Sequence, residues 1–188
     1  LYQSALFERV RTELAESGCN PRSWHQANSA GIIGGLTGDG GSVRAGIAMY
    51  GVAPSSTIGL PAGLRPVMAL HSRVARVTEL APGDTVGYGR TYVCHRPERV
   101  ALVPIGYGDG YRRELSNRGR MAIDGAAVPV VGRVSMDQTV VKLPPGLSVA
   151  VGDAVAVFGS SEAGEPRVEE VAELCGTISY EILTGISL

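Results

Sequence analysis

The chain changes its sequence pattern at residues 59–63, where glycine, proline and alanine replace the regular apolar spacing. Before this point, apolar residues recur at helical spacing from Leu1 to about Ser17, and a strand-like stretch at 23–26 and a helical turn follow. After it, short β-branched runs alternate with turns. We therefore expect two domains, an α/β part at 1–62 and a β-rich part at 63–188.

The β-rich part is predicted to contain short strands and one helix. Asp124-Gly125 is a strong hairpin signal, because both residue types tolerate positive φ. A helix is expected at 168–174, where glutamates flank apolar residues. The α/β part is too short to bury a core alone, so we expect further chain to complete it. The expected strands lie at 67–77, 100–105, 121–123, 128–131, 139–143 and 154–158.

Composition argues against several classes of function. The 17 basic and 18 acidic residues nearly balance and are scattered singly, so we expect no nucleic-acid or membrane partner. No apolar run approaches the roughly 20 residues of a membrane span, and no secretory signal is expected. Cys19, Cys94 and Cys175 are widely spaced and form no CxxC pair, so neither a disulfide framework nor a metal site is predicted. A cytoplasmic location is the simplest expectation.

Five segments contain residues that can carry chemistry, and four of them also contain glycine. In the β-rich part these are Gly87-Tyr88-Gly89, the run 106–111 and the segment 132–138, where glycine allows close backbone approach and a phenol can exchange a proton. In the α/β part, 25–29 and 44–51 are predicted to follow strands. A strand end that turns into a helix offers N–H groups and a hydroxyl to an anion.

In their order along the chain, the five segments resemble the alanine racemase family, and the resemblance extends from Trp24 to Tyr180. It implies an α/β barrel remnant, the last strands of a TIM-type barrel, followed by an all-β, barrel-like C-terminal domain. It also implies pyridoxal 5′-phosphate as cofactor and two-base interconversion of L- and D-alanine for peptidoglycan precursors. The family works as a homodimer with active sites shared between subunits.

The resemblance assigns a role to each motif residue. Tyr88 matches the catalytic tyrosine that acts on one face of the substrate α-carbon. Tyr107 and Met136 match substrate-binding residues that reach the partner's barrel. The positions that match cofactor-binding residues are His25, Asn28, Ser29, Arg44, Gly46, Ile47 and Tyr180. Among these, His25 is expected to orient Arg44, which faces the cofactor ring. Asn28 is expected to approach the cofactor, and Ser29, Gly46, Ile47 and Tyr180 to hold its phosphate.

The lysine that binds the family's cofactor as a Schiff base has no counterpart in these 188 residues. Lys142 is the only lysine, and it lies in a strand before two prolines, without glycine- and alanine-rich surroundings. We expect it to be a solvated strand or interface charge. The resemblance places the Schiff-base lysine in a missing N-terminal barrel segment, so this chain alone is not expected to be active.

Simpler interpretations of single residues stay open. Asn28 and Ser29 can be a helix cap, Arg44 a solvated surface charge, and Tyr88 and Tyr180 packed side chains. Two other functions also stay open for the whole chain. One is a racemase of serine or a basic amino acid, and the other is a catalytically empty dimerisation or binding module that lacks the Schiff-base lysine segment.

Overall fold

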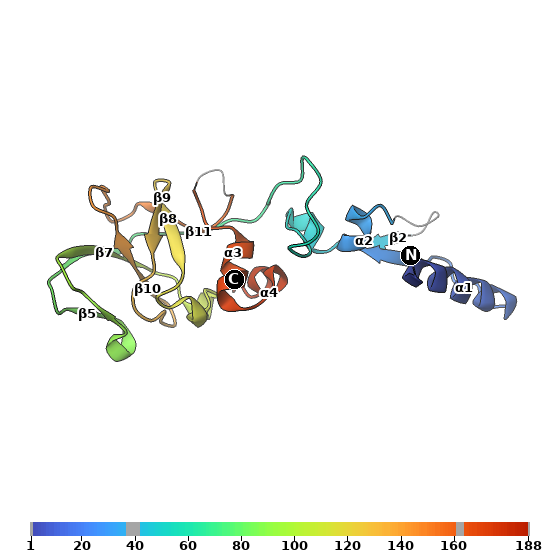
Figure 1. Cartoon of the computed structure of the whole chain (residues 1–188), viewed down its shortest axis with the longest axis horizontal. Helices are drawn as coiled ribbons and strands as arrows, with labels where there is room; N and C mark the ends of the chain where they lie inside the picture. The colour runs from blue at the N-terminus through green and yellow to red at the C-terminus, as the bar shows by residue number, and fades with distance from the viewer. Residues whose placement is uncertain (1, 37–41, 161–163, 188) are drawn as a thin grey trace. The chain divides into compact units, whose positions relative to one another are not determined.

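The computed structural model describes residues 2–36, 42–160 and 164–187 and divides the chain into two units, Leu1–Arg65 and Pro66–Leu188 (Figure 1). Each unit is described by itself. Among the described residues, no helix combines the length and the apolar character that a membrane crossing requires.

The first unit begins with helix α1 (Tyr2–Glu16), which confirms the helix predicted from apolar spacing. Strands β1 (His25–Asn28) and β2 (Ser42–Arg44) pair in parallel, and helix α2 (Ser29–Ile33) follows β1 directly. The strand predicted at 23–26 thus lies two residues further along the chain. A 3₁₀ helix, η1 (Ile47–Tyr50), comes after β2. A strand, a helix and a parallel strand in succession are typical of α/β barrels.

The second unit contains nine strands within the described residues, arranged in three sheets. A three-stranded antiparallel sheet has the order β10–β7–β4, and a four-stranded sheet has the order β3–β11–β8–β9. Strands β5 and β6 form a small hairpin of their own. The bounds are β3 (Leu70–Arg73), β4 (Arg76–Leu80), β5 (Thr85–Val86), β6 (Tyr92–Val93), β7 (Glu98–Val103), β8 (Arg120–Ile123), β9 (Ala126–Pro129), β10 (Thr139–Leu143) and β11 (Ala154–Phe158).

The core of the second unit follows the alternation of its strands. Ala101 and Val103 of β7 and Val141 of β10 are fully buried on one face of the three-stranded sheet. The opposite face carries Val100, which packs in a separate cluster with Val86 and Val131. Both faces of this sheet therefore carry buried apolar side chains.

Two features of the second unit differ from the prediction. The stretch 67–77 is not one strand: it is divided between β3 and β4, which belong to different sheets on either side of buried Val74. The unit is also not all-β, since helices α3 (Val168–Cys175) and α4 (Ser179–Thr184) end it. The helix predicted at 168–174 is confirmed by α3. None of the sheets formed by the described residues closes on itself, so the barrel-like arrangement is not confirmed.

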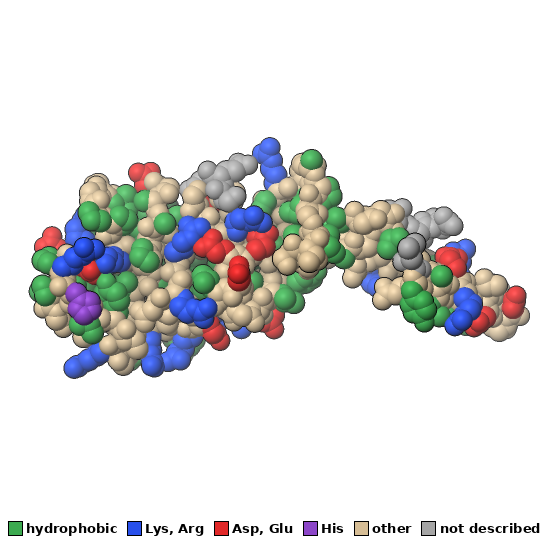
Figure 2. Space-filling view, in the orientation of Figure 1, with side chains coloured by type: hydrophobic (Ala, Val, Ile, Leu, Met, Phe, Trp, Pro, Cys, Tyr) green, Lys and Arg blue, Asp and Glu red, His purple; other side chains and the backbone are tan. Residues whose placement is uncertain are grey.

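On the face of the second unit drawn in Figure 2, basic and acidic side chains are interspersed and form no single stripe. The hairpin predicted at Asp124-Gly125 is present between β8 and β9, with φ of 49° and 72° at the two turn residues. These positive values are those of the two-residue turn that matches the twist of the strands.

Candidate active site

A buried hydroxyl lies where the parallel strands β1 and β2 end. Asn28 of β1 is opposite Arg44 of β2, so the residues that follow the two strands meet at one edge. Ser29 is only 3% exposed, and its Oγ accepts hydrogen bonds from the backbone N–H groups of Gly46 (3.0 Å) and Ala48 (3.2 Å). A hydroxyl has two lone pairs and one proton. Both lone pairs are used, so the proton of Ser29 is left to donate, and no acceptor for it is present within the described residues.

The backbone between the N–H groups of Gly46 and Ala48 is held in place by the buried side chain of Ile47. Ile47 is 3% exposed, so its side chain anchors the start of η1 in the first unit. Within the described residues, the Ile47 N–H forms no hydrogen bond. The hydroxyl of Ser29 and the N–H of Ile47 are therefore two hydrogen-bond donors at the same strand edge, as an anion requires.

The remaining predicted residues of the first unit fall into two groups. A guanidinium nitrogen of Arg44 donates to Nδ1 of His25, on the neighbouring parallel strand. Asn28 instead caps α2, because its Oδ1 accepts the Gly31 N–H at 3.0 Å. Asn28 is therefore a helix cap in this structure, and its approach to the cofactor stays a prediction.

In the second unit, two glycine-rich loops are joined through backbone hydrogen bonds. Tyr107 N–H donates to the carbonyl of Ser135 at 3.0 Å, and Gly108 N–H donates to that of Met136 at 2.8 Å. Asp109 closes the first loop by accepting the Gly106 N–H at 2.8 Å. The side chains of Tyr107 and Met136 are 46% and 62% exposed. The structure thus brings these two predicted substrate-binding residues together on one surface.

Tyr88 lies on a third loop that packs against the same segment. It begins the 3₁₀ helix η2 (Tyr88–Arg90), between β5 and β6. Gly87 has φ of 73°, and a Cβ there would lie 2.9 Å from the Arg133 backbone nitrogen, so only glycine fits this turn. Because Arg133 and Met136 belong to one segment, residues 132–136 connect the Tyr88 loop to the Tyr107 loop.

The exposure of these tyrosines bears on the packing interpretation. Tyr88 is 75% exposed and Tyr180, on α4, is 38% exposed. Within the described residues, the hydroxyls of Tyr88, Tyr107 and Tyr180 form no hydrogen bonds. Tyr111 is the contrasting case, because it is 3% exposed and burial raises the pKa of its phenol. Tyr88 is therefore not a packed core side chain within its unit.

Lys142 lies in strand β10, as predicted, but it is not a freely solvated charge. Its Nζ lies 2.6 Å from Oε1 of Glu98 and 3.4 Å from the hydroxyl of Tyr92, which itself donates to Oε2 of Glu98. The Glu98 side chain is 6% exposed and that of Lys142 is 26% exposed. Lys142 pairs with Val100, so Glu98, two residues away on β7, is its diagonal cross-strand neighbour. Lys142 is thus a partly buried charge that is paired within its own unit.

Lys142, Glu98 and Tyr92 form a hydrogen-bonded network that was not predicted from the sequence. The hydrogen bond from Lys142 lowers the pKa of the Glu98 carboxyl, and the bond to Glu98 raises the pKa of the Lys142 ammonium. The signal available in the sequence was the position of Lys142 between Val141 and Leu143, because a charge in an apolar strand needs a partner. That partner is 44 residues away in the chain.

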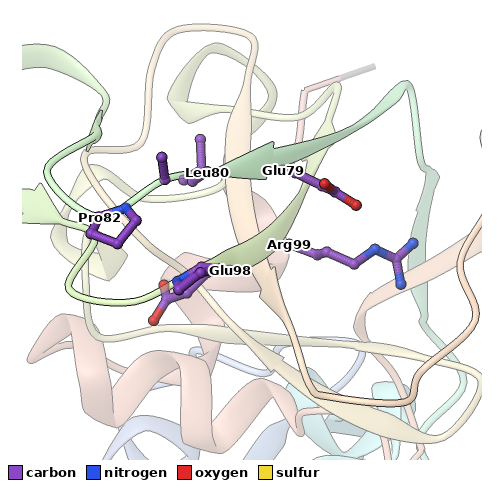
Figure 3. Close-up of a pocket in the computed structure, with 7 residues that line it drawn as sticks. Glu79, Leu80, Pro82, Glu98 and Arg99 are labelled. Carbon is purple, nitrogen blue, oxygen red and sulfur yellow. The ribbon is translucent and has the colours of Figure 1, made fainter.

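Two cavities flank this network. One, of about 440 Å³, lies where β4 and β7 approach the turn that follows β4, and Figure 3 shows Glu79 and Arg99 extending from these paired strands. It contains none of the predicted site residues. The other, of about 560 Å³, is lined by Thr91, Tyr92, Val93, His95, Arg96, Glu98 and Lys142.

A methyl group at Gly106 is expected to separate the two loops. The added Cβ would lie 2.2 Å from the Ser135 carbonyl oxygen and 2.4 Å from that of Met136, so the backbone must shift. We expect Gly106→Ala to lower the free energy of unfolding by about 2 kcal/mol, as measured by urea denaturation of the full-length protein. Gly59→Ala is the control, since its Cβ would meet nothing within 4 Å. Equal stability of the two variants would contradict the described loop contact.

Comparison with known proteins gives the same family for both units. The model of the alanine racemase C-terminal domain matches residues 67–188, and that of the alanine racemase N-terminal domain matches residues 1–54. An alanine racemase of Symbiobacterium thermophilum is 42% identical over 181 residues, which cover 96% of this chain and 48% of that protein. The chain spans about half the length of the curated relatives it matches.

Solved structures agree with the sequence matches. An alanine racemase of Bacillus anthracis, solved with bound L-Ala-P, has a TM-score of 0.89 and 39% identity over 98% of this chain and 48% of its own. One from Bartonella henselae, with covalently bound pyridoxal phosphate, has a TM-score of 0.82 and 32% identity over 98% of this chain and 48% of its own. A barrel part followed by a C-terminal β domain fits these relatives. On these matches, the chain belongs to the alanine racemase family.

Proposed function

We propose that the full-length protein containing this chain is a pyridoxal 5′-phosphate-dependent alanine racemase that interconverts L- and D-alanine. The observation that carries the proposal is the surface on which exposed Tyr88, Tyr107 and Met136 are held by one segment, residues 132–136. The relatives named above support it because they are alanine racemases. One of them was solved with bound L-Ala-P and another with covalently bound pyridoxal phosphate. The D-alanine produced would supply peptidoglycan precursors.

The strand edge of the first unit fits a cofactor that carries a phosphate. Ser29 has a hydroxyl proton to donate, and the Ile47 N–H forms no hydrogen bond within the described residues, so both can bind phosphate oxygens. Gly46 keeps the backbone beside Ser29 free of a side chain. Arg44, oriented by His25, would face the cofactor ring as a permanent positive charge. We assign Asn28 and Tyr180 to the same cofactor-binding set by resemblance.

Tyr88 is proposed to move the α-hydrogen of the substrate on one face of the α-carbon. When bound, pyridoxal 5′-phosphate withdraws electrons from that carbon and makes its hydrogen acidic. A phenol has a pKa near 10 in water and needs neighbouring cations to act as a base near neutral pH. Tyr88 is suited to this task because its hydroxyl is exposed and is bonded to no other described residue.

Substrate binding and assembly are proposed together. Tyr107 and Met136 would line the substrate site from across a homodimer interface, so that each dimer contains two equivalent sites. In this proposal residues 1–62 belong to the cofactor-binding barrel and residues 63–188 are the C-terminal domain. The Schiff-base lysine would come from the part of the relatives' length that this chain does not span, because Lys142 is already paired with Glu98.

The activity is tested with purified full-length protein loaded with pyridoxal 5′-phosphate. We expect L-alanine to be converted to an equal mixture of its enantiomers, followed by chiral chromatography, and L-serine and L-lysine to react more slowly. One methylene changes substrate discrimination by only about 1 to 3 kcal/mol, so all three substrates are needed. Faster conversion of serine or lysine would assign the protein to another racemase, and no conversion of any substrate would favour a binding module.

Replacing Ser29 by alanine is expected to weaken cofactor binding. The variant removes a hydrogen bond to a charged group, which corresponds to about a 10- to 100-fold higher Kd for pyridoxal 5′-phosphate. Titration of the cofactor-free full-length protein, followed by absorbance, measures this. Ser55→Ala is the matched control, because Ser55 is exposed and its hydroxyl bonds Thr57. An unchanged Kd for Ser29→Ala would remove Ser29 from the proposed phosphate site.

A further inference from the structure

The hairpin that carries Tyr88 has little backbone structure of its own. Strands β5 and β6 contain two residues each, and their ladder consists of the pairs Thr85–Val93 and Val86–Tyr92. A hairpin this short is not stable alone in water. Its position must therefore be set by the side chains that attach it to the rest of the unit.

Both strands of the hairpin are attached to one face of the three-stranded sheet. Val86 of β5 is 6% exposed and packs with Val100 of β7 and Val131, and the ring of Tyr92 in β6 packs on the same cluster. Tyr92 comes four residues after Tyr88 and begins β6, so its place determines where the loop of Tyr88 ends. Apolar packing alone holds the ring on the sheet but gives its position little direction, because such contacts are non-directional.

Directional bonds come from the charged pair that contacts the Tyr92 hydroxyl. The Tyr92 hydroxyl donates to one oxygen of Glu98, and Lys142 donates to the other oxygen at 2.6 Å and to the Tyr92 hydroxyl at 3.4 Å. Glu98 is on β7 and Lys142 is on β10, so the three residues join three strands. Because the Glu98 side chain is only 6% exposed, water cannot readily replace these bonds.

We propose that Lys142 and Glu98 are positioning residues, which fix Tyr92 and through it the loop of Tyr88. This inference rests on the proposed role of Tyr88. The opposite side of the loop is already fixed, since Gly87 and Gly89 pack against Arg133. The network supplies the second support, and without it the phenol of Tyr88 loses its alignment with the substrate α-carbon.

The test compares Tyr92→Phe and Lys142→Met in the full-length protein loaded with pyridoxal 5′-phosphate. Each variant keeps the apolar bulk of the residue and removes its hydrogen bond. We expect kcat to fall about 10- to 100-fold, the effect of misplacing a catalytic group by about 1 Å, with a much smaller change in KM. Arg120→Met is the control, because it breaks an ion pair of the same length, 2.6 Å to Glu170, in the same unit, and should leave kcat unchanged.

An isotope effect distinguishes lost alignment from general damage. L- and D-alanine have equal free energies, so kcat/KM must fall by the same factor in both directions. With α-deuterated substrates, however, the isotope effect should rise only for the enantiomer whose α-hydrogen Tyr88 removes. Lys142→Arg, which keeps the charge, should recover part of kcat.

Three outcomes would overturn the inference: unchanged kcat in Tyr92→Phe and Lys142→Met, an isotope effect that rises equally for both enantiomers, or an equal loss of kcat in Arg120→Met. These outcomes differ from failure of the proposed function. If Tyr88→Phe keeps full activity, the role of Tyr88 is wrong. If Tyr88→Phe is inactive while Tyr92→Phe and Lys142→Met are normal, only the positioning role is wrong.

Discussion

Replacing Tyr88 by phenylalanine in the full-length protein is expected to lower kcat for alanine racemisation by about 10²- to 10⁴-fold in both directions, the usual contribution of an acid–base group. The substitution removes the hydroxyl and keeps the ring. Because Tyr88 is 75% exposed and its hydroxyl is bonded to no other described residue, the melting temperature should not change. Chiral chromatography of reactions started from each enantiomer measures the effect.

The control for Tyr88→Phe is the same substitution at Tyr2, which is 80% exposed on α1 and has no proposed catalytic role. Tyr2→Phe should retain full activity. An equally active Tyr88→Phe would show that the second unit contributes no proton-transfer group from this loop, and the tyrosine would then have to be assigned to an interface or a binding surface.

Replacing Lys142 by methionine is expected to lower the free energy of unfolding by about 3 kcal/mol at pH 7. This is the lower end of the range for breaking a buried ion pair, because the Lys142 side chain is 26% exposed. The loss arises mainly from Glu98, which would stay buried without its cation. Urea denaturation of the full-length protein measures it. Arg167→Met breaks a more exposed pair with Glu169 and should cost less than about 1 kcal/mol.

The cost of Lys142→Met should depend on pH in a defined direction. In the native network, Lys142 and then Tyr92 lower the pKa of Glu98, so the stability that Glu98 contributes is present above its unfolded pKa and is lost in acid. The raised pKa of Lys142 gives a contribution that is present below its unfolded value and is lost in alkali. Burial, and then Glu98, raise the pKa of Tyr92, so Tyr92 lowers stability only in alkali. Arg96, which lies 3.8 Å from Glu98, is a second cation near this carboxyl.

These directions predict that the pair stabilises fully between about pH 5 and pH 10. Lys142 is the largest cause of the lowered pKa of Glu98, so without it Glu98 takes up a proton and becomes neutral at a higher pH than in the unmodified protein. The stability difference between Lys142→Met and the unmodified protein should therefore be smaller at pH 4 than at pH 7. An equal difference at both pH values would mean that Glu98 is not the group left unpaired.

Local signals in the sequence were sufficient for several elements. Helices α1 and α3 follow from apolar spacing, and the β8–β9 hairpin follows from Asp124-Gly125, since few other residue pairs accept positive φ twice in succession. The glycines around Tyr88 and Tyr107 also have a local cause, because side chains at Gly87 and Gly106 would collide with the segment 132–136.

What the sequence did not predict depends on contacts between distant residues. A charge on a short strand is usually solvated, and only the register of β7 against β10 places Glu98 beside Lys142. Helix α4 has six residues, fewer than periodicity can identify, and its buried Ile182 and Leu183 are defined by tertiary packing. The division of 67–77 into β3 and β4 likewise depends on which sheet each half joins.

The central claim, that Tyr88 exchanges hydrogen on one face of the alanine α-carbon while a second base acts on the other, is tested most directly by isotope transfer. A single turnover of L-[α-²H]alanine in ordinary water by the full-length protein loaded with pyridoxal 5′-phosphate should give D-alanine that carries protium at the α-carbon, because the base that removes deuterium differs from the acid that returns hydrogen. D-alanine that retains its deuterium would mean that one group serves both faces and would contradict the account.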